Sequence, residues 1–240
     1  MRMSPPALPR RAAAEFIGTS ALVAVIVGSG IRADALSQDT GVRLLANAGA
    51  SALGLGLLIA LIGPLSGAHF NPVVTLSEWW YGRRRGTGHE ALAYIAAQLA
   101  GAVTGALLAE AMFGRPPGAW ATEPRSALHL LLGEAVATAG LVLVVRGLHH
   151  IGRPGLAPVA VAGYIGAAIW FTSSGSFANP AATLGRAFSD SFTGIAPASV
   201  PAFAAAQLLG MLLGMGLAGV LYGTRGTPGE PNATEPRRTE

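Results

Sequence analysis

The sequence predicts an all-α membrane protein, in which six transmembrane helices and two re-entrant half-helices form an inverted 3+3 repeat. Three observations lead to this fold class. Only 12% of the 240 residues are charged and 51% are hydrophobic, whereas a soluble domain carries about 25% charged residues. Six apolar stretches are long enough to cross a bilayer, and motifs of the first half recur in the second. This composition excludes a disordered chain and an ordinary soluble enzyme.

Six segments are predicted to span the membrane, because a bilayer core of about 30 Å needs roughly 20 apolar residues of helix. They are residues 12–31, 42–63, 90–113, 127–146, 155–172 and 200–223. Two further apolar segments, 71–80 and 179–188, are too short to cross, since ten helical residues rise only about 15 Å. We expect both to be re-entrant, because non-helical backbone at that depth must lie inside protein or along a water-filled cavity.

The basic residues predict the orientation of these spans. Most Arg residues lie on one side of the membrane if the N-terminus is cytoplasmic, as the positive-inside rule requires. The predicted cytoplasmic set is Arg2, Arg10, Arg11, Arg83, Arg84, Arg85, Arg146, Arg153, Arg225, Arg237 and Arg238, and the outer set is Arg32, Arg43, Arg115 and Arg125. We therefore expect a protein of the plasma (inner) membrane with both termini cytoplasmic. It divides into a cytoplasmic tail at 1–11, a membrane domain at 12–223 with repeats at 12–113 and 127–223, and a disordered cytoplasmic tail at 224–240.

Three pairs of motifs define the internal repeat. The first half contains Glu15-x-x-Gly18-Thr19, Gly67-x-x-x-Asn71-Pro72 and Gln98-x-x-Gly101-x-x-x-Gly105. The second half contains, in the same order, Glu134-x-x-Ala137-Thr138, Gly175-x-x-x-Asn179-Pro180 and Gln207-x-x-Gly210-x-x-x-Gly214. The shorter offsets after the first pair predict a longer loop in the first half, near 34–41. Three spans per half is an odd number, so the second half enters from the opposite face, and a site lies near the midplane. The paired glycines are typical of helices that pack closely in lipid.

An Asn-Pro dipeptide opens each short segment, at Asn71-Pro72 and Asn179-Pro180. Asn is a favoured helix N-cap and Pro a favoured first helical residue. Two helix N-termini that face each other carry partial positive charge and repel cations. The Asn amides can donate hydrogen bonds to a polar solute, and the backbone at 67–70 and 175–178 can offer carbonyl acceptors. This arrangement favours a path for small neutral polar molecules.

These residues resemble a known family. SGAHFNPVVT at 66–75 and SFANPA at 176–181 resemble the paired Asn-Pro-Ala boxes of the major intrinsic protein family, the aquaporins and aquaglyceroporins, and AEFIGT at 14–19 resembles its first-helix signature. The resemblance covers residues 12–223 and implies an aquaporin-like channel domain there, assembled as a homotetramer with one pore per subunit. The implied pore boxes are Asn71, Pro72, Val73, Asn179, Pro180 and Ala181. The implied pore-lining loop backbone is Gly67, Ala68, His69, Gly175, Phe177 and Ala178.

Two positions depart from the family pattern. Val73 replaces the Ala of the first box, a mild change. After the second box the family usually places the Arg of its selectivity filter, and here that residue is Ala182. Counting from the boxes as in the family, the remaining filter positions fall at Ser51, Ala167 and Ser176, and the second is uncertain by two residues. A filter of these residues is predicted to be wide and to admit polyols or metalloid acids besides water.

The nearest cation to Ala182 is Arg186, one helical turn toward the predicted outer mouth. Arg186 either pairs with Asp190 on the surface or supplies the outer-mouth charge that Ala182 lacks. The residues around it, at 171–180 and 186–195, also resemble the bacterial subgroup encoded beside arsenic-resistance genes, whose members are regarded as channels for trivalent and methylated arsenicals.

Other polar residues allow two interpretations each. Glu15 and Glu134 lie within predicted spans, where a carboxylate is costly. The resemblance implies structural acceptors for the backbone N–H groups of the re-entrant loops, and the alternative is a proton relay. The His69 ring either packs against the protein or touches solute. A last set holds Glu78 and Glu110, expected at span ends, and His149 and His150, expected in a cytoplasmic loop that is either simply solvated or gates by pH.

The leading expectation is a passive channel for small uncharged solutes: glycerol-like polyols, metalloid acids such as arsenous acid, and water. The alternatives are a water-selective aquaporin and an ion-coupled secondary transporter, which needs coupling carboxylates near the midplane. The sequence has no His-Glu-x-x-His motif, no convincing nucleophile–base pair and no Cys, so we expect no catalytic residues, metal or cofactor. The expected partners are small neutral solutes, water and the lipid bilayer. Nucleic acid is not expected, because the net charge of +4 is modest.

Overall fold

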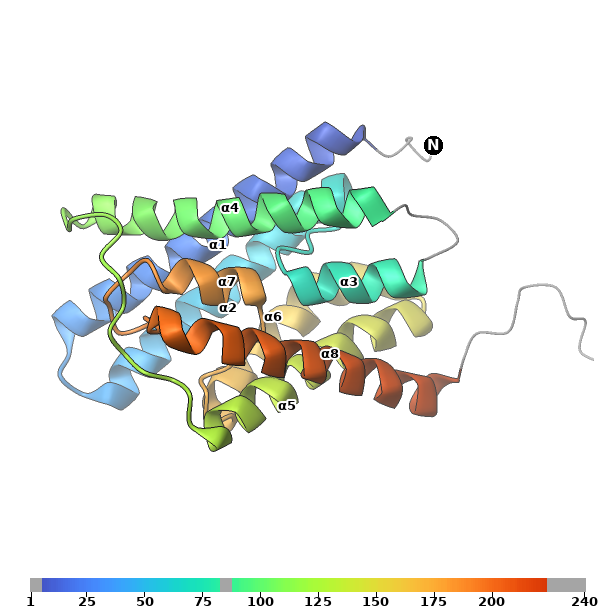
Figure 1. Cartoon of the computed structure of the whole chain (residues 1–240). Helices are drawn as coiled ribbons and strands as arrows, with labels where there is room; N and C mark the ends of the chain where they lie inside the picture. The colour runs from blue at the N-terminus through green and yellow to red at the C-terminus, as the bar shows by residue number, and fades with distance from the viewer. Residues whose placement is uncertain (1–5, 83–87, 224–240) are drawn as a thin grey trace, which may run out of the picture.

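The computed structural model describes residues 6–82 and 88–223 (Figure 1). The predicted disordered tail at 224–240 and the basic run Arg83–Arg85 lie outside these residues. Within the described ranges all regular secondary structure is helical. The helices are α1 (Leu8–Leu36), α2 (Thr40–Ser66), α3 (Pro72–Tyr81), α4 (Gly88–Met112), α5 (Leu128–His150), η1 (Pro154–Leu156), α6 (Ala157–Phe171), α7 (Pro180–Arg186), η2 (Pro197–Ser199) and α8 (Val200–Tyr222).

Six of these elements are long and apolar enough to span a membrane, as predicted: α1, α2, α4, α5, α6 with η1, and α8 with η2. The protein is therefore a multi-pass membrane protein. Helix α1 begins at Leu8, inside the stretch predicted as a tail, and Arg11 on it pairs with Glu90 at 2.7 Å.

The loop predicted near 34–41 is wrong, because α1 ends at Leu36 and α2 begins at Thr40. The extra length of the first half lies in its helices, since α1 and α2 have 29 and 27 residues while α5 and α6 have 23 and 15. The loop predicted for His149 and His150 is also helix, because α5 continues to His150. The basic side chains of these two residues in the last turn suit the negative end of the helix dipole.

The paired glycines allow two pairs of helices to touch backbone to backbone. A Cβ added at Gly101 or Gly105 of α4 would lie 2.4 or 2.2 Å from a carbonyl oxygen of α1. The equivalent positions Gly210 and Gly214 of α8 would each place a Cβ 2.4 Å from a carbonyl oxygen of α5. Close approach of this kind drives helix association in lipid, where apolarity alone does not. The structural role predicted for these glycines is confirmed.

We expect Gly214→Val to destabilise the folded protein strongly. Its side chain would collide with the backbone of Ala139, and overpacking of this kind costs at least about 1–3 kcal/mol. The measurements are the yield of monodisperse protein in detergent and its midpoint of thermal unfolding. Gly216→Val is the matched control, because a Cβ at Gly216, two residues along α8, would meet no atom within 4 Å. Equal losses in both variants would contradict the packing argument.

The two short helices lie end to end in the middle of the bundle. Figure 1 shows α3 and α7 between α4 and α8, and the chain enters each from the centre. Helix α3 has ten residues, as predicted, while α7 has seven and ends at Arg186 rather than at Phe188. Each half of the chain contains three spanning elements and one short helix, so the fold is the inverted 3+3 repeat that the sequence predicts.

Candidate functional site

A cavity of about 800 Å³ inside the bundle is lined by both re-entrant loops and by residues near both ends of the spanning helices. One end, which we call the Glu78 mouth, is lined by Glu78, Leu148 and His149. The other, the Arg186 mouth, is lined by Arg186, Phe192 and Thr193. Between the mouths the lining is mainly apolar, apart from the re-entrant loops and a few hydroxyl groups.

The two Asn side chains at the centre join the halves of the repeat. Asn71 Oδ1 accepts from Val73 N at 3.1 Å, and Asn179 Oδ1 accepts from Ala181 N at 2.9 Å, so each amide oxygen caps its own half-helix. Asn71 Nδ2 donates to Ala178 O at 2.7 Å, and Asn179 Nδ2 donates to Phe70 O at 2.8 Å. Each NH2 group has two hydrogens, so one remains for a solute in the cavity. Both residues line the cavity.

The loops that lead into the half-helices have the same unusual backbone. Ala68 and Phe70 have φ of 50°, and their repeat equivalents Ser176 and Ala178 have φ of 46°. This left-handed region is strained for residues other than Gly, and such strain collects at functional sites. Within the described residues, no hydrogen bond reaches the carbonyl oxygens at 67–69 or 175–177. These residues line the cavity and offer it a row of acceptors.

A buried carboxylate supports each of these loops. Glu15 accepts from Ser66 Oγ at 2.6 Å, from His69 N at 3.0 Å and from Phe70 N at 2.7 Å. Glu134 accepts from Phe177 N at 2.9 Å and from Ala178 N at 2.8 Å. Both side chains are fully buried. Their oxygens are therefore occupied by the donors of the re-entrant loops.

A Gln and a Thr complete each support, and their roles were not predicted from the sequence. Gln98 Nε2 donates to Glu15 at 2.8 Å and to Thr75 at 2.9 Å. Gln207 Nε2 donates to Glu134 at 2.6 Å and to Thr183 at 2.9 Å. The repeat contained the signal, because Gln98 and Gln207 occupy matched motif positions and both are polar residues in apolar spans.

Three of the four predicted filter residues line the cavity: Ser51, Ser176 and Ala182. The hydroxyl groups of Ser51 and Ser176 are buried and have no hydrogen-bond partner in the described part of the chain. Ala167 itself is exposed and does not line the cavity, so this prediction holds only within its uncertainty of two residues. Ile165 and Ile169, each two residues away, line the cavity instead. Residues 172–179, between the end of α6 and the second box, are not helical, so helical spacing counted from the box does not fix the inward face of α6.

Arg186 does not pair with Asp190. Asp190 Oδ1 accepts from Thr122 N at 3.0 Å, whereas Arg186 Nε donates to the carbonyl of Thr193. The Arg186 guanidinium lies over the Phe177 ring, 3.2 Å from its centre, and its side chain is only 8% exposed although it lines the cavity. The surface-pair interpretation is therefore wrong, and the cation belongs to the mouth.

A second cation, Arg125, lines the same mouth and was not singled out from the sequence. Its guanidinium carbon lies 5.3 Å from the centre of the Phe177 ring, and its Nε donates to Gly194 O at 2.9 Å. Burial lowers the pKa of Arg125, and the carboxylates of Glu123 and Glu134 oppose this. An Arg starts from so high a pKa that it stays charged. No repeat equivalent or motif marks this residue, because it lies in the connection between the halves.

The Glu78 mouth carries an ion pair. Glu78 accepts from Arg146 at 3.3 Å, and the His149 ring lies 3.5 Å from the same oxygen.

The His69 ring contacts Thr75 at 3.1 Å and packs edge-on against Tyr94, while the residue also lines the cavity. The expected span-end position of Glu110 is right in sequence, but the side chain is buried at 1% exposure and binds Arg115 at 3.0 Å. In the described residues, no group of three or more His, Cys, Asp or Glu side chains could hold a metal ion.

Comparison with known proteins gives one family. The family model described as major intrinsic protein matches residues 3–173. A relative from Rhizobium meliloti, "Aquaglyceroporin AqpS", is 45% identical over 210 residues, which are 88% of this chain and 89% of the relative. "Probable aquaporin AqpM" of Archaeoglobus fulgidus is 32% identical and covers 78% of this chain and 86% of its own.

A solved structure agrees in fold. The X-ray structure of the aquaglyceroporin from Plasmodium falciparum superposes with a TM-score of 0.64 at 23% identity, covering 88% of this chain and 95% of that one. At this identity the likeness shows the fold alone. Together with the family match, it explains the paired Asn-Pro half-helices around one cavity, as in a channel for water or small solutes. The chain belongs to the major intrinsic protein family, whose members are non-enzymatic channels.

Proposed function

We propose that this channel conducts small uncharged solutes passively: glycerol-like polyols and metalloid acids such as arsenous acid, together with water. The observation that carries the proposal is Ala182. It lies one turn from the central Asn179, lines the cavity and leaves only a methyl group where the family usually has an Arg. Ser51 and Ser176, two small residues, line the same cavity. The name of the 45%-identical relative, an aquaglyceroporin, supports a polyol-conducting channel.

The lining also argues against coupling to an ion. Glu15 and Glu134 are the carboxylates nearest the loops, and their oxygens are occupied by backbone and Gln donors. A coupling carboxylate must gain and lose a proton or cation during transport, which these bonds oppose. Passive flow along donors and acceptors fits the cavity better than a proton relay.

The proposed setting is the plasma (inner) membrane, with both termini cytoplasmic. The Arg residues of the whole sequence favour this orientation, so the Arg186 mouth opens to the outside and the Glu78 mouth to the cytoplasm. We also propose a homotetramer with one pore per subunit. The α2 span supports a further contact, because only 17% of its most apolar window is buried in one subunit.

Stopped-flow light scattering on proteoliposomes tests the proposed function. Gradients of sucrose, glycerol and arsenous acid are applied in turn, and the volume change is followed. We expect glycerol and arsenous acid to enter at rates that rise linearly with concentration and need no ion gradient. Saturable flux that requires an ion gradient would show a transporter. Fast water flux with both solutes excluded would show a water-selective aquaporin.

We expect Arg186→Ala to admit monovalent cations or to raise glycerol flux. The guanidinium lines the mouth, and a fixed positive charge in a low-dielectric entrance repels cations. The measurements are cation leak by a fluorescent indicator and glycerol flux by stopped flow. Arg153→Ala is the control, since Arg153 is exposed and precedes η1, away from this mouth. Unchanged selectivity and flux in Arg186→Ala would refute this role.

A further inference from the structure

The Arg186 mouth contains two guanidinium groups around one aromatic ring. Arg186 lies 3.2 Å and Arg125 lies 5.3 Å from the centre of the Phe177 ring. The two residues come from distant parts of the chain: one ends α7, and the other lies in the connection between the halves. Both line the cavity. Two cations therefore share the entrance of a channel that is otherwise lined mainly by apolar groups.

Two consecutive carbonyls hold these cations in place. Arg186 Nε donates to Thr193 O, and Arg125 Nε donates to Gly194 O at 2.9 Å. No hydrogen bond to a described residue uses the terminal NH2 groups of either side chain. The orientation of each guanidinium is thus fixed at Nε, while its NH2 groups remain as donors. Guanidinium donors in a fixed fork match the oxygens of carboxylate, sulfate or phosphate.

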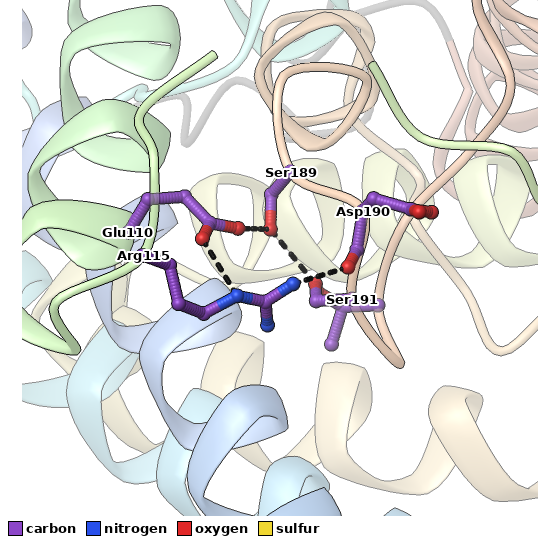
Figure 2. Close-up of polar contacts among 6 residues, drawn as sticks. Glu110, Arg115, Ser189, Asp190 and Ser191 are labelled. Carbon is purple, nitrogen blue, oxygen red and sulfur yellow. Dashed lines mark hydrogen bonds and ion pairs between the residues drawn. The ribbon is translucent and has the colours of Figure 1, made fainter. Parts of the chain in front are cut away.

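The segment that carries both carbonyls is itself held rigidly. Figure 2 shows the Glu110 carboxylate between Ser189 Oγ and the Arg115 guanidinium, with Arg115 also reaching Asp190. The backbone adds Gly194 N to Ser191 O at 2.8 Å. A Cβ at Gly194 would lie 2.8 Å from Ser189 O, so the turn is also tightly packed. The two cations are therefore held in position before any ligand arrives, which lowers the entropy cost of binding.

Among residues 6–82 and 88–223, neither Arg125 nor Arg186 forms an ion pair. The carboxylates of Glu123 and Glu134 act on Arg125 only from beyond ion-pair distance. Glu123 is exposed, and Glu134 is occupied by Phe177 N, Ala178 N and Gln207. Two like charges at a partly desolvated site repel each other, and an anion between them would relieve that repulsion.

We propose that the Arg186 mouth is a binding site for one small oxyanion of the sulfate or phosphate class, held between Arg125 and Arg186. A bound anion occupies the entrance to the cavity, so it blocks the passage of neutral solutes from that side. The block rests on the proposed function, while the binding itself does not. The site also gives Arg125 a specificity role, because each solute that enters must pass two guanidinium groups rather than one.

Binding is tested on the purified protein by thermal unfolding in detergent. Sodium sulfate and sodium phosphate are compared with sodium chloride at equal ionic strength. A ligand that binds only the folded state raises the unfolding midpoint as its concentration increases, and we expect this for both oxyanions. Arg125→Gln and Arg186→Gln should each weaken the apparent affinity at least about tenfold, since a charge-assisted hydrogen bond contributes about 1.5–3 kcal/mol.

The block is tested on proteoliposomes by glycerol flux, with the oxyanion added outside, inside or on both sides. We expect inhibition only from the side of the Arg186 mouth, and a matching shift of the half-inhibitory concentration in both variants, each compared with its own flux in chloride. Arg43→Gln is the control. Arg43 lies in the first turn of α2, and it already pairs with Asp34 at 2.7 Å. Arg125→Lys keeps the positive charge but loses the paired donors of the guanidinium. Its apparent affinity for the oxyanion should lie between those of Arg125→Gln and the unmodified protein. This variant also covers the case in which Arg125→Gln does not fold.

The outcomes separate the two proposals. Absence of glycerol flux in chloride refutes the proposed function, and the unfolding measurement still decides whether the oxyanion site exists. No oxyanion-specific stabilisation, or equal stabilisation of the unmodified protein and both Gln variants, overturns the site. Stabilisation without inhibition from either side overturns the block.

Discussion

Replacing Ala182 with Arg is expected to abolish glycerol and arsenous acid flux while water flux continues. The methyl group of Ala182 is 2% exposed and lines the cavity three residues after Asn179. An Arg side chain there is long enough to extend into the cavity, which Ser51 and Ser176 also line. The long side chain fills part of the cavity, so glycerol and arsenous acid are excluded before the smaller water molecule. We expect at least about a hundredfold loss for glycerol, which corresponds to about 2.7 kcal/mol of added barrier.

The matched control separates charge from bulk. Ala182→Leu fills part of the same space without a cation, so it should reduce glycerol flux but leave the exclusion of cations unchanged. Stopped-flow measurements with water, glycerol and arsenous acid compare the three proteins. Undiminished glycerol flux in Ala182→Arg would contradict the claim that this position controls the bore.

The central part of the site is predictable from the sequence because local rules and the repeat agree. Asn-Pro is both an N-cap and a helix start, and α3 and α7 begin at the residues it indicates. The glycine pairs are specified by helix spacing, so their contacts follow once the spans are known. Glu15 and Glu134 are recognisable as a pair because each begins the same motif. Two copies of one signal allowed inferences that a single copy would not support.

The Arg186 mouth depends on contacts between distant segments and was not predictable in the same way. Arg125 lies in a connection with no repeat equivalent, and only the folded chain brings it to Phe177. Asp190 is four residues from Arg186, which suggests a helical pair, but α7 ends at Arg186 and the chain turns away. The filter position on α6 was displaced by two residues for a related reason, because residues 172–179 between α6 and the second box are not helical and helical spacing cannot be counted through them. Sequence spacing therefore predicts contacts within regular helices, but not across segments of irregular backbone.

The cavity lining contains more positive charge than the sequence suggests. The sequence suggests a wall almost free of charge, with one displaced Arg near its outer end. The structure places two guanidinium groups at that end and none at the Ala182 position. In the proposed function, the barrier to cations therefore combines the central half-helix dipoles with a charged entrance several residues away. The proposed wide bore is compatible with cation exclusion, because different residues would provide them.

Glu134→Ala is expected to prevent recovery of a folded, conducting channel. Without the carboxylate, Phe177 N, Ala178 N and Gln207 Nε2 all lose an acceptor in a buried site. Each unsatisfied donor costs about 1–3 kcal/mol, and the sum is comparable to the whole stability of a typical domain, about 5–15 kcal/mol. The strained backbone at Ser176 and Ala178 then lacks the support that offsets its own cost of about 1–3 kcal/mol per residue. Yield, thermal midpoint and glycerol flux measure the loss.

Two further variants decide what the Glu134 carboxylate does. Glu90→Ala removes a partly exposed acid that pairs with Arg11, and it should lower the free energy of unfolding by no more than about 1 kcal/mol. If the protein were destabilised by the loss of any Glu side chain, this variant would also fold poorly. Glu134→Gln keeps one acceptor oxygen but turns an NH2 group toward the loop donors, so it should fold poorly and conduct in proportion to the folded fraction. A proton relay predicts the opposite: a stable Glu134→Gln protein that has lost pH-dependent transport. Stability and flux must therefore fall together if the carboxylate acts by holding the loop, because the loop it holds is also the wall of the pore.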